Sequence, residues 1–231
     1  MGFKTRCRTE RARKIEFLAY DTNVDYLHET SKAAAALGFA AVNEEIGDLS
    51  RLGRLVPGDA RFDFITLTNT VHEVTPTQLA EALVDAVLRL SDRGILFVYD
   101  MERVKPPELG AVPFSAHDFQ AVSGALIGSL TDNDYRPEVS SWQHSTTRGW
   151  NVQIQREYIS VNHETLVAKR APAITATEQA THGVLRRRLS QCREALELLT
   201  KFGPDTAEEH DDREHLLYEF WAITRALEPS A

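Results

Sequence analysis

Polar side chains that could bind a ligand or move a proton follow the apolar, strand-like stretches of this chain. They are Asp21, Asn23, Asp48, Asn69, His72, Glu73, Asp100 and Glu102. A carboxylate can accept two hydrogen bonds from neighbouring hydroxyl groups, and the ordinary pKa of histidine suits proton transfer near neutral pH. The carboxyl ends of parallel strands form one rim, where open α/β sheets bind their ligands. We therefore expect these residues to gather at one edge of a sheet.

Several of these residues also have a purely structural interpretation. Asp21 can cap the helix that follows it, and Thr22 and Asn23 compete for the same place. Asp48 is equally suited to a turn. His72 can be a loop histidine that is bonded to the backbone.

A metal site is not predicted from the sequence. Glu73 suits the first turn of a helix, and Asp100 suits the end of a strand. Together with His72 these two carboxylates lack a recognised ligand spacing.

Composition limits the class of protein. The chain has 231 residues, of which 42 % are apolar and 26 % charged, and its net charge is -8. These values are typical of a soluble globular protein, and the acidic balance predicts no nucleic-acid partner. Cys7 and Cys192 form neither a disulfide framework nor a zinc pattern. No apolar run is long enough for a membrane span, and no signal peptide follows Met1, so we expect a cytoplasmic protein without membrane contact.

The first part of the chain alternates between strand-like and helix-like patterns. Strands are expected at residues 14–20, 39–42, 62–67 and 95–99, and helices at 24–37, from Thr75 and from Ser115. Thr75, Pro76 and Gln78 form the signature of a capped helix start. The run ILFVY at residues 95–99 is typical of a central strand that is buried on both faces. This order predicts an α/β domain with a mostly parallel sheet.

The later part of the chain predicts an antiparallel pair and two long helices. Residues 137–144 and 150–159 are joined by a turn-rich segment and are expected to pair at the sheet edge. From about residue 175, apolar residues recur at spacings of three and four on both sides of Gly203 and Pro204, which predicts a helical hairpin. Its apolar seam either packs within the chain, or docks on the sheet domain, or forms a dimer interface.

The sequence resembles class I S-adenosylmethionine-dependent methyltransferases. The resemblance covers about residues 14–158 and is carried by AYDTN, then GDL, then FDFITLTNTVHEV, then a helix and RGILFVYDME. It implies a Rossmann-like fold and S-adenosylmethionine as cofactor. By position it implies that Asp21 binds the ribose hydroxyls, with Thr22, Asn23, Asp48 and Leu49 around the nucleoside. It places Asn69 and Thr70 beside the methyl donor, and His72 on the acceptor side as a candidate general base.

The chain departs from that family at its most diagnostic motif. A glycine-rich turn after the first strand is missing, since Gly2 is the only glycine before Gly38. The first strand, usually the central one, has no candidate either. Three explanations are open: a shortened methyltransferase, a relative that kept the fold without the cofactor, or a sheet that another chain completes. An incomplete sheet exposes unpaired strand edges, which favours association.

These observations predict the following organisation and activity. We expect a basic leader at residues 1–13, an α/β domain at 14–160, a linker at 161–174 and a helical hairpin at 175–231. The expected activity is methyl transfer to a small-molecule acceptor. The alternative is a non-catalytic scaffold that binds a partner chain, or a second copy, through the hairpin or the incomplete sheet.

Overall fold

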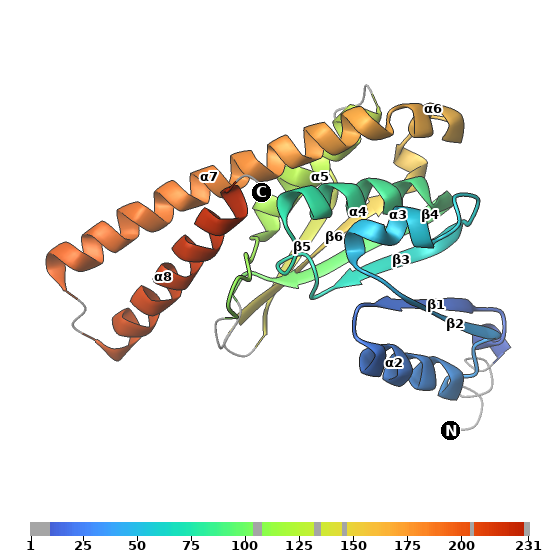
Figure 1. Ribbon diagram of the computed structural model, residues 1–231, viewed down its shortest axis with the longest axis horizontal. Coiled ribbons are helices and arrows are strands. Elements are labelled where there is room, and N and C mark those ends of the chain that lie inside the picture. The colour runs from blue at the N-terminus through green and yellow to red at the C-terminus, as the bar shows by residue number, and fades with distance from the viewer. Residues whose placement is uncertain (1–9, 104–107, 132–134, 145–146, 204–205, 229–231) are drawn as a thin grey trace. The chain divides into compact units, whose positions relative to one another are not determined.

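The computed structural model describes residues 10–103, 108–131, 135–144, 147–203 and 206–228 (Figure 1). It divides into two units, residues 1–57 and 58–231, and each unit is described here by itself. Most of the expected basic leader, including Cys7, lies outside the described residues. The expected boundaries near residues 160 and 175 both fall inside the second unit.

The first unit is a strand–helix–strand element. Strands β1 (Glu16–Asp21) and β2 (Ala41–Ile46) pair in parallel, and helix α2 (Val24–Ala36) connects them. Asn23 caps the helix by accepting from two backbone N–H groups, and Gly38 follows its end with a φ of 81°. Glycine suits this place because a positive φ carries no Cβ penalty there. The short helices η1 (Leu49–Arg51) and α3 (Leu52–Leu55) follow β2.

The expected bounds of the second strand were wrong. Residues 39–42 were predicted, but β2 continues through the polar residues Asn43, Glu44 and Glu45. Each residue from Ala41 to Ile46 has a partner in β1. Backbone pairing therefore decides the strand here, and alternation of apolar side chains does not.

The second unit holds a four-stranded mixed sheet in the order β3-β4-β6-β5. Its strands are β3 (Phe62–Thr68), β4 (Leu90–Met101), β5 (Glu138–His144) and β6 (Thr147–Gln155). The β3–β4 pair is parallel, whereas β6 runs antiparallel to both β4 and β5. The predicted α/β class with an antiparallel pair at one edge is thus confirmed. The second of these strands ends four residues earlier than predicted, because the short helix η2 (Arg156–Tyr158) begins there.

Helices α4 (Pro76–Leu88) and α5 (Ala116–Leu130) pack on this sheet. The predicted capping box of Thr75 and Gln78 is present, with Pro76 at the first position of α4. In β4, Leu96 and Val98 are fully buried, whereas Phe97 between them is only half-buried. The prediction that this strand is buried on both faces was therefore wrong, since its side chains alternate between a covered face and a more open one.

The C-terminal helices are α6 (His163–Ala168), α7 (Arg170–Phe202) and α8 (Ala207–Leu227). Where a linker was expected at residues 161–174, Asn162 caps α6 and α7 begins at Arg170. Figure 1 shows α7 running along α4 and α5, with α8 folded back against its C-terminal half. Two of the three interpretations of the apolar seam therefore hold within the chain: α7 and α8 pack against each other, and α7 docks on α4 and α5 of the sheet unit.

Each unit has a sheet of its own. Strands β1 and β2 pair in the first unit, and within the second unit β4 is the partner of β3 among the described strands. No stretch of the sequence was a candidate for the strand that the resemblance places first. None of the helices in the described residues combines the length and the apolar character needed to cross a membrane.

Candidate functional site

A buried histidine and a buried aspartate meet at the carboxyl ends of the two parallel strands of the second unit. His72 lies in the loop after β3, and Asp100 is the penultimate residue of β4. Nδ1 of His72 lies 2.6 Å from Oδ1 of Asp100, and the backbone N–H of His72 donates to Oδ2 at 3.3 Å. The N–H of Met101 also donates to Oδ1, at 2.7 Å. Asp100 therefore fixes both the ring and the main chain of His72.

Electrostatics at this pair favours the protonated imidazole. Burial by itself lowers the pKa of His72, whereas the hydrogen bond and the charge of Asp100 raise it. The charges of Glu73 and Glu108 act in the same direction, and together these groups raise the pKa of His72 above its usual value. The ring is therefore a stronger base than a free histidine.

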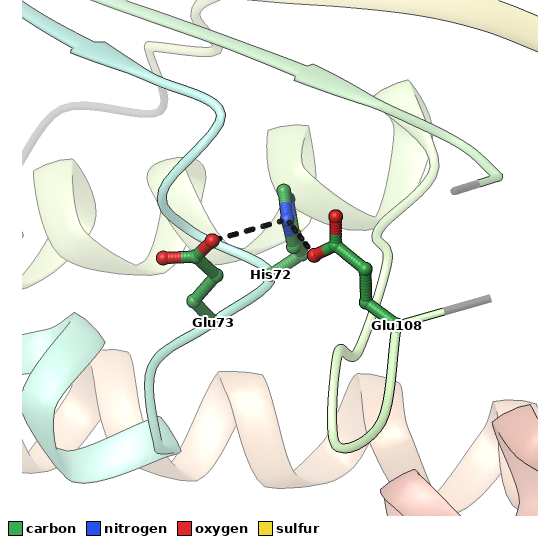
Figure 2. Close-up of side chains that lie close together, drawn as sticks. All are labelled: His72, Glu73 and Glu108. Carbon is green, nitrogen blue, oxygen red and sulfur yellow. Dashed lines mark ion pairs between the residues drawn. The ribbon is translucent and has the colours of Figure 1, made fainter. Parts of the chain in front are cut away.

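Two carboxylates face the opposite nitrogen of this ring. Nε2 of His72 lies 3.9 Å from Oε1 of Glu73 and 3.6 Å from Oε2 of Glu108. Figure 2 shows the two carboxylates approaching the imidazole from either side. The N–H of Val112 donates to the carbonyl oxygen of His72 at 2.7 Å, which ties the loop after β4 to the loop after β3. The site is thus built by two loops that follow adjacent strands.

The turn that carries His72 begins at a residue with unusual backbone geometry. Asn69 has a φ of 52°, in the left-handed region that non-glycine residues rarely adopt, although asparagine tolerates it well. Its N–H still donates to the carbonyl of Tyr99 at 3.0 Å, so the sheet pairing runs to this point. Thr70 Oγ1 then donates to the carbonyl of Thr68 at 2.9 Å. These bonds define how the chain leaves the strand and turns towards His72.

A cavity adjoins this cluster. It has a volume of about 280 Å³ and lies between the loop after β4 and helix α8. Four carboxylates are among its lining residues, namely Glu102, Glu108, Asp212 and Glu219. Arg103 bonds Asp212 at 2.8 Å and so holds the loop to α8. Glu108 belongs both to this cavity and to the histidine cluster, and it connects the two.

The residues expected to bind the nucleoside lie at one end of the first unit. Asp21 ends β1, and its Oδ1 accepts from the N–H of Asn23 at 2.8 Å. Asp48 follows β2, and its Oδ1 accepts from the N–H and the hydroxyl of Ser50. Tyr20 donates its hydroxyl to the Asp48 carbonyl at 2.6 Å. The strand-end arrangement brings Asp21 and Asp48 together, while Asn23 performs the capping that was one interpretation of Asp21.

The structure separates the predicted site residues into two groups. Asp21, Thr22, Asn23, Asp48 and Leu49 belong to the first unit, whereas Asn69, Thr70 and His72 belong to the second. The sequence placed His72 and Asp100 on the same rim, but it predicted neither the bond between them nor the approach of Glu108 to His72. The bond had a usable signal, because both residues follow neighbouring strands of a predicted parallel sheet. The approach of Glu108 depends on the course of the long loop after β4, which the sequence pattern does not fix.

Fold and site together define an α/β protein with a polar rim at its strand ends and a buried histidine–aspartate pair. No family model matches the chain, and no curated protein matches it. Solved structures of methyltransferases are similar to it. An rRNA methylase from Streptococcus thermophilus shares 15 % identity over 61 % of this chain and 72 % of its own, with a TM-score of 0.39.

Two further structures show the same level of similarity. The arsenic(III) S-adenosylmethionine methyltransferase CrArsM from Chlamydomonas reinhardtii shares 19 % identity over 64 % of this chain and 57 % of its own, with a TM-score of 0.41. The N-methyltransferase NodS from Bradyrhizobium japonicum shares 11 % identity over 66 % of this chain and 92 % of its own, with a TM-score of 0.40. At such identities their side chains assign no role to a residue of this chain.

Proposed function

We propose that this protein transfers a methyl group from S-adenosylmethionine to a small-molecule acceptor, with His72 as the group that takes the acceptor's proton. The observation that carries the proposal is the buried His72–Asp100 pair beside a cavity of about 280 Å³. A cavity near the lower end of the usual size for ligand sites suits a small molecule better than a polymer. The net charge of -8 also disfavours a nucleic-acid acceptor.

The first unit offers groups that fit the nucleoside part of the cofactor. The Asp21 carboxylate stands at a strand end, where it can accept from both ribose hydroxyls, as the resemblance implies. Asp48 and Leu49 would lie against the adenine. The glycine-rich turn that normally receives the methionine part is missing, so the first unit would hold the cofactor mainly through its nucleoside. When bound, the cofactor supplies a methyl group that is already activated on a sulfonium.

The chain's own residues then have two tasks, which are to orient the acceptor and to accept its proton. Asp100 holds Nδ1 of His72, so Nε2 is the atom that would receive the proton from an acceptor hydroxyl or ammonium group. Glu108 reaches both this atom and the cavity, and would hold a hydroxylated or cationic acceptor. An acceptor without such a proton would need only the positioning.

Titration calorimetry tests whether the cofactor site exists. S-adenosylhomocysteine is titrated into the full 231-residue chain, into Asp21→Ala and into Asp25→Ala. Asp25 lies in the first turn of α2 and provides the same loss of charge four residues away. Micromolar binding by the parent chain and by Asp25→Ala, weakened at least about tenfold in Asp21→Ala, would support the proposal, since charge-assisted bonds to a carboxylate contribute this much. A folded parent chain that does not bind would overturn it.

A second candidate function is a non-catalytic scaffold that takes a partner strand. It is favoured by the position of β3 at the end of the sheet of the second unit and by Phe64 on that strand, whose side chain is exposed. Size-exclusion chromatography with light scattering discriminates the two candidates. A chain that binds no S-adenosylhomocysteine and associates, and that becomes monomeric in Phe64→Lys, would be such a scaffold.

A further inference from the structure

The histidine cluster has the arrangement of donor atoms that a metal ion requires. One donor atom each from His72, Glu73 and Glu108 lies within 4.8 Å of the other two. They come from two different loops, and the imidazole and both carboxylates turn towards a common point (Figure 2). Among the described residues this is the one such group of histidine, cysteine or acidic side chains.

The histidine of this cluster is oriented as metal-binding histidines are. Such residues donate the N–H of one ring nitrogen to a carboxylate, which leaves the lone pair of the other nitrogen for the cation. Here Asp100 binds Nδ1, and Nε2 faces Glu73 and Glu108 without a hydrogen-bond partner among the described residues. His72 is 3 % exposed and Asp100 is fully buried, so the ring is held in this orientation.

The negative charge of the cluster also favours binding of a cation. Three carboxylates surround one imidazole, and within the described part of the chain neither Glu73 nor Glu108 forms an ion pair with an arginine or lysine. A single proton on His72 would still leave an excess of negative charge at the site. A divalent ion would neutralise two carboxylates and bind the free imidazole nitrogen in one step.

We propose that His72, Glu73 and Glu108 bind one divalent transition-metal ion, with Asp100 as the residue that positions the histidine. One nitrogen and two carboxylate oxygens suit Zn²⁺ or Mn²⁺. Donor atoms around such an ion lie roughly 3.0–3.4 Å apart. The two carboxylates lie 3.6 and 3.9 Å from Nε2, and all three donor atoms lie within 4.8 Å of one another, so side-chain rotations have to bring them closer. Both glutamates are more than half exposed and can make them.

Such a site has consequences for the chemistry beyond the function proposed above. Three protein ligands leave at least one position open for water or for an acceptor oxygen, whose proton the cation would make more acidic. Nε2 cannot hold a cation and accept a proton at the same time. The two roles of His72 therefore belong to two forms of the protein: the cation-free form would use Nε2 as the base, and in the cation-bound form the cation would activate a hydroxyl acceptor. Cation binding itself requires neither S-adenosylmethionine nor an acceptor, so its test is independent of the function.

Mn²⁺ titrated into the chelator-stripped full chain tests the proposal. We expect one bound ion per chain, seen as loss of the free Mn²⁺ electron paramagnetic resonance signal, with a coupling to one imidazole nitrogen. Glu73→Gln and Glu108→Gln should each weaken binding at least tenfold, and His72→Gln should abolish the nitrogen coupling. Asp100→Asn should weaken binding by about 10–100-fold, as loss of a residue behind a ligand does.

The control is Glu164→Gln, an equivalent change in the first turn of α6 and outside the cluster. It should bind Mn²⁺ as the parent chain does, and circular dichroism confirms that each variant is folded. Absence of stoichiometric binding to the parent chain would overturn the proposal. So would binding that the two glutamate variants leave unchanged, since the ion would then sit elsewhere.

Discussion

Nδ1 of His72 lies 2.6 Å from Oδ1 of Asp100, and this bond joins the loop after β3 to the end of β4. The same carboxylate accepts from the backbone N–H groups of His72 and Met101. One buried side chain thus sets the position of the loop that carries the candidate proton acceptor. The candidate site and the local stability of the strand ends therefore depend on the same residue.

Removing this carboxylate should destabilise the second unit. Asp100→Ala leaves three donors of a buried site without their acceptor, and each such loss costs about 1–3 kcal/mol. We expect a loss of about 3 kcal/mol in the free energy of unfolding, measured with urea. Asp63→Ala is the control, because Asp63 is exposed and accepts one hydrogen bond, from the Ser91 hydroxyl, within the described residues. It should change stability by less than about 0.5 kcal/mol. Equal losses in the two variants would contradict the interpretation.

The ion pair between Asp85 and Arg170 should hold α7 on α4. Both of its nitrogen–oxygen distances are 2.8 Å, and Asp85 is only 2 % exposed. The pair is partly screened because Arg170 is 42 % exposed. Arg170→Met, which leaves the buried carboxylate with Arg89 alone, should cost about 2–3 kcal/mol, less than the 3–5 kcal/mol of a fully buried pair.

An exposed ion pair provides the comparison for Arg170→Met. Arg225 and Glu228 lie 2.8 Å apart near the end of α8, with 64 % and 51 % of their side chains exposed. Arg225→Met should change stability by no more than about 0.5 kcal/mol. Thermal unfolding of both variants measures the difference. A Tm for Arg170→Met equal to that of Arg225→Met would show that the Asp85–Arg170 pair does not stabilise the packing of α7 on α4.

Two glycines should respond to alanine in opposite directions. A Cβ on Gly94 would lie 2.6 Å from the carbonyl oxygen of Phe62 on the neighbouring strand, so the backbone would have to move. Gly94→Ala should cost about 1–3 kcal/mol. Gly128 in α5 has no atom within 4 Å of such a Cβ, and Gly128→Ala should stabilise the helix by up to about 1 kcal/mol. Chemical denaturation of the pair tests both signs at once.

Cys192 should be an unreactive thiol. Burial raises its pKa to about 12 from 9.0, and the charge of Glu219 acts in the same direction. At pH 8 the thiolate fraction should be about a thousandfold lower than that of an ordinary thiol. In a Cys7→Ser chain, reaction with a maleimide should therefore be slow unless urea is added. Rapid reaction of the folded chain at pH 8 would contradict this.

The same shift predicts how stability depends on pH. Above about pH 9 the Cys192 thiol ionises in the unfolded chain while it stays neutral in the folded one, so unfolding releases a proton. Stability from this group is complete below pH 9 and falls as the pH rises towards 12. Urea unfolding at pH 8 and 10.5 should show a smaller decline in Cys7→Ser/Cys192→Ala than in Cys7→Ser.

Much of the local structure could be predicted from the sequence. The start of α4 follows from Thr75, Pro76 and Gln78, and the end of α2 from Gly38, because caps and turns depend on residues close together in the chain. Alternating strands and helices predicted the α/β class for the same reason. The sequence offered no candidate for the first strand of the family, and the described strands form one sheet in each unit.

The tertiary structure alone decided which of these residues meet. Glu108 reaches His72 across 36 positions of the chain, and Asp100 supports the ring instead of facing its free nitrogen. Arg170 bonds Asp85, which lies 85 positions away in the chain, and so the segment that was expected to be a linker contains the start of a docked helix. Local patterns fix where strands and helices form, but the register of strand pairs and the course of long loops fix which side chains converge. Sequence therefore determined the framework and its polar rim, while packing determined the cluster on which the proposed chemistry depends.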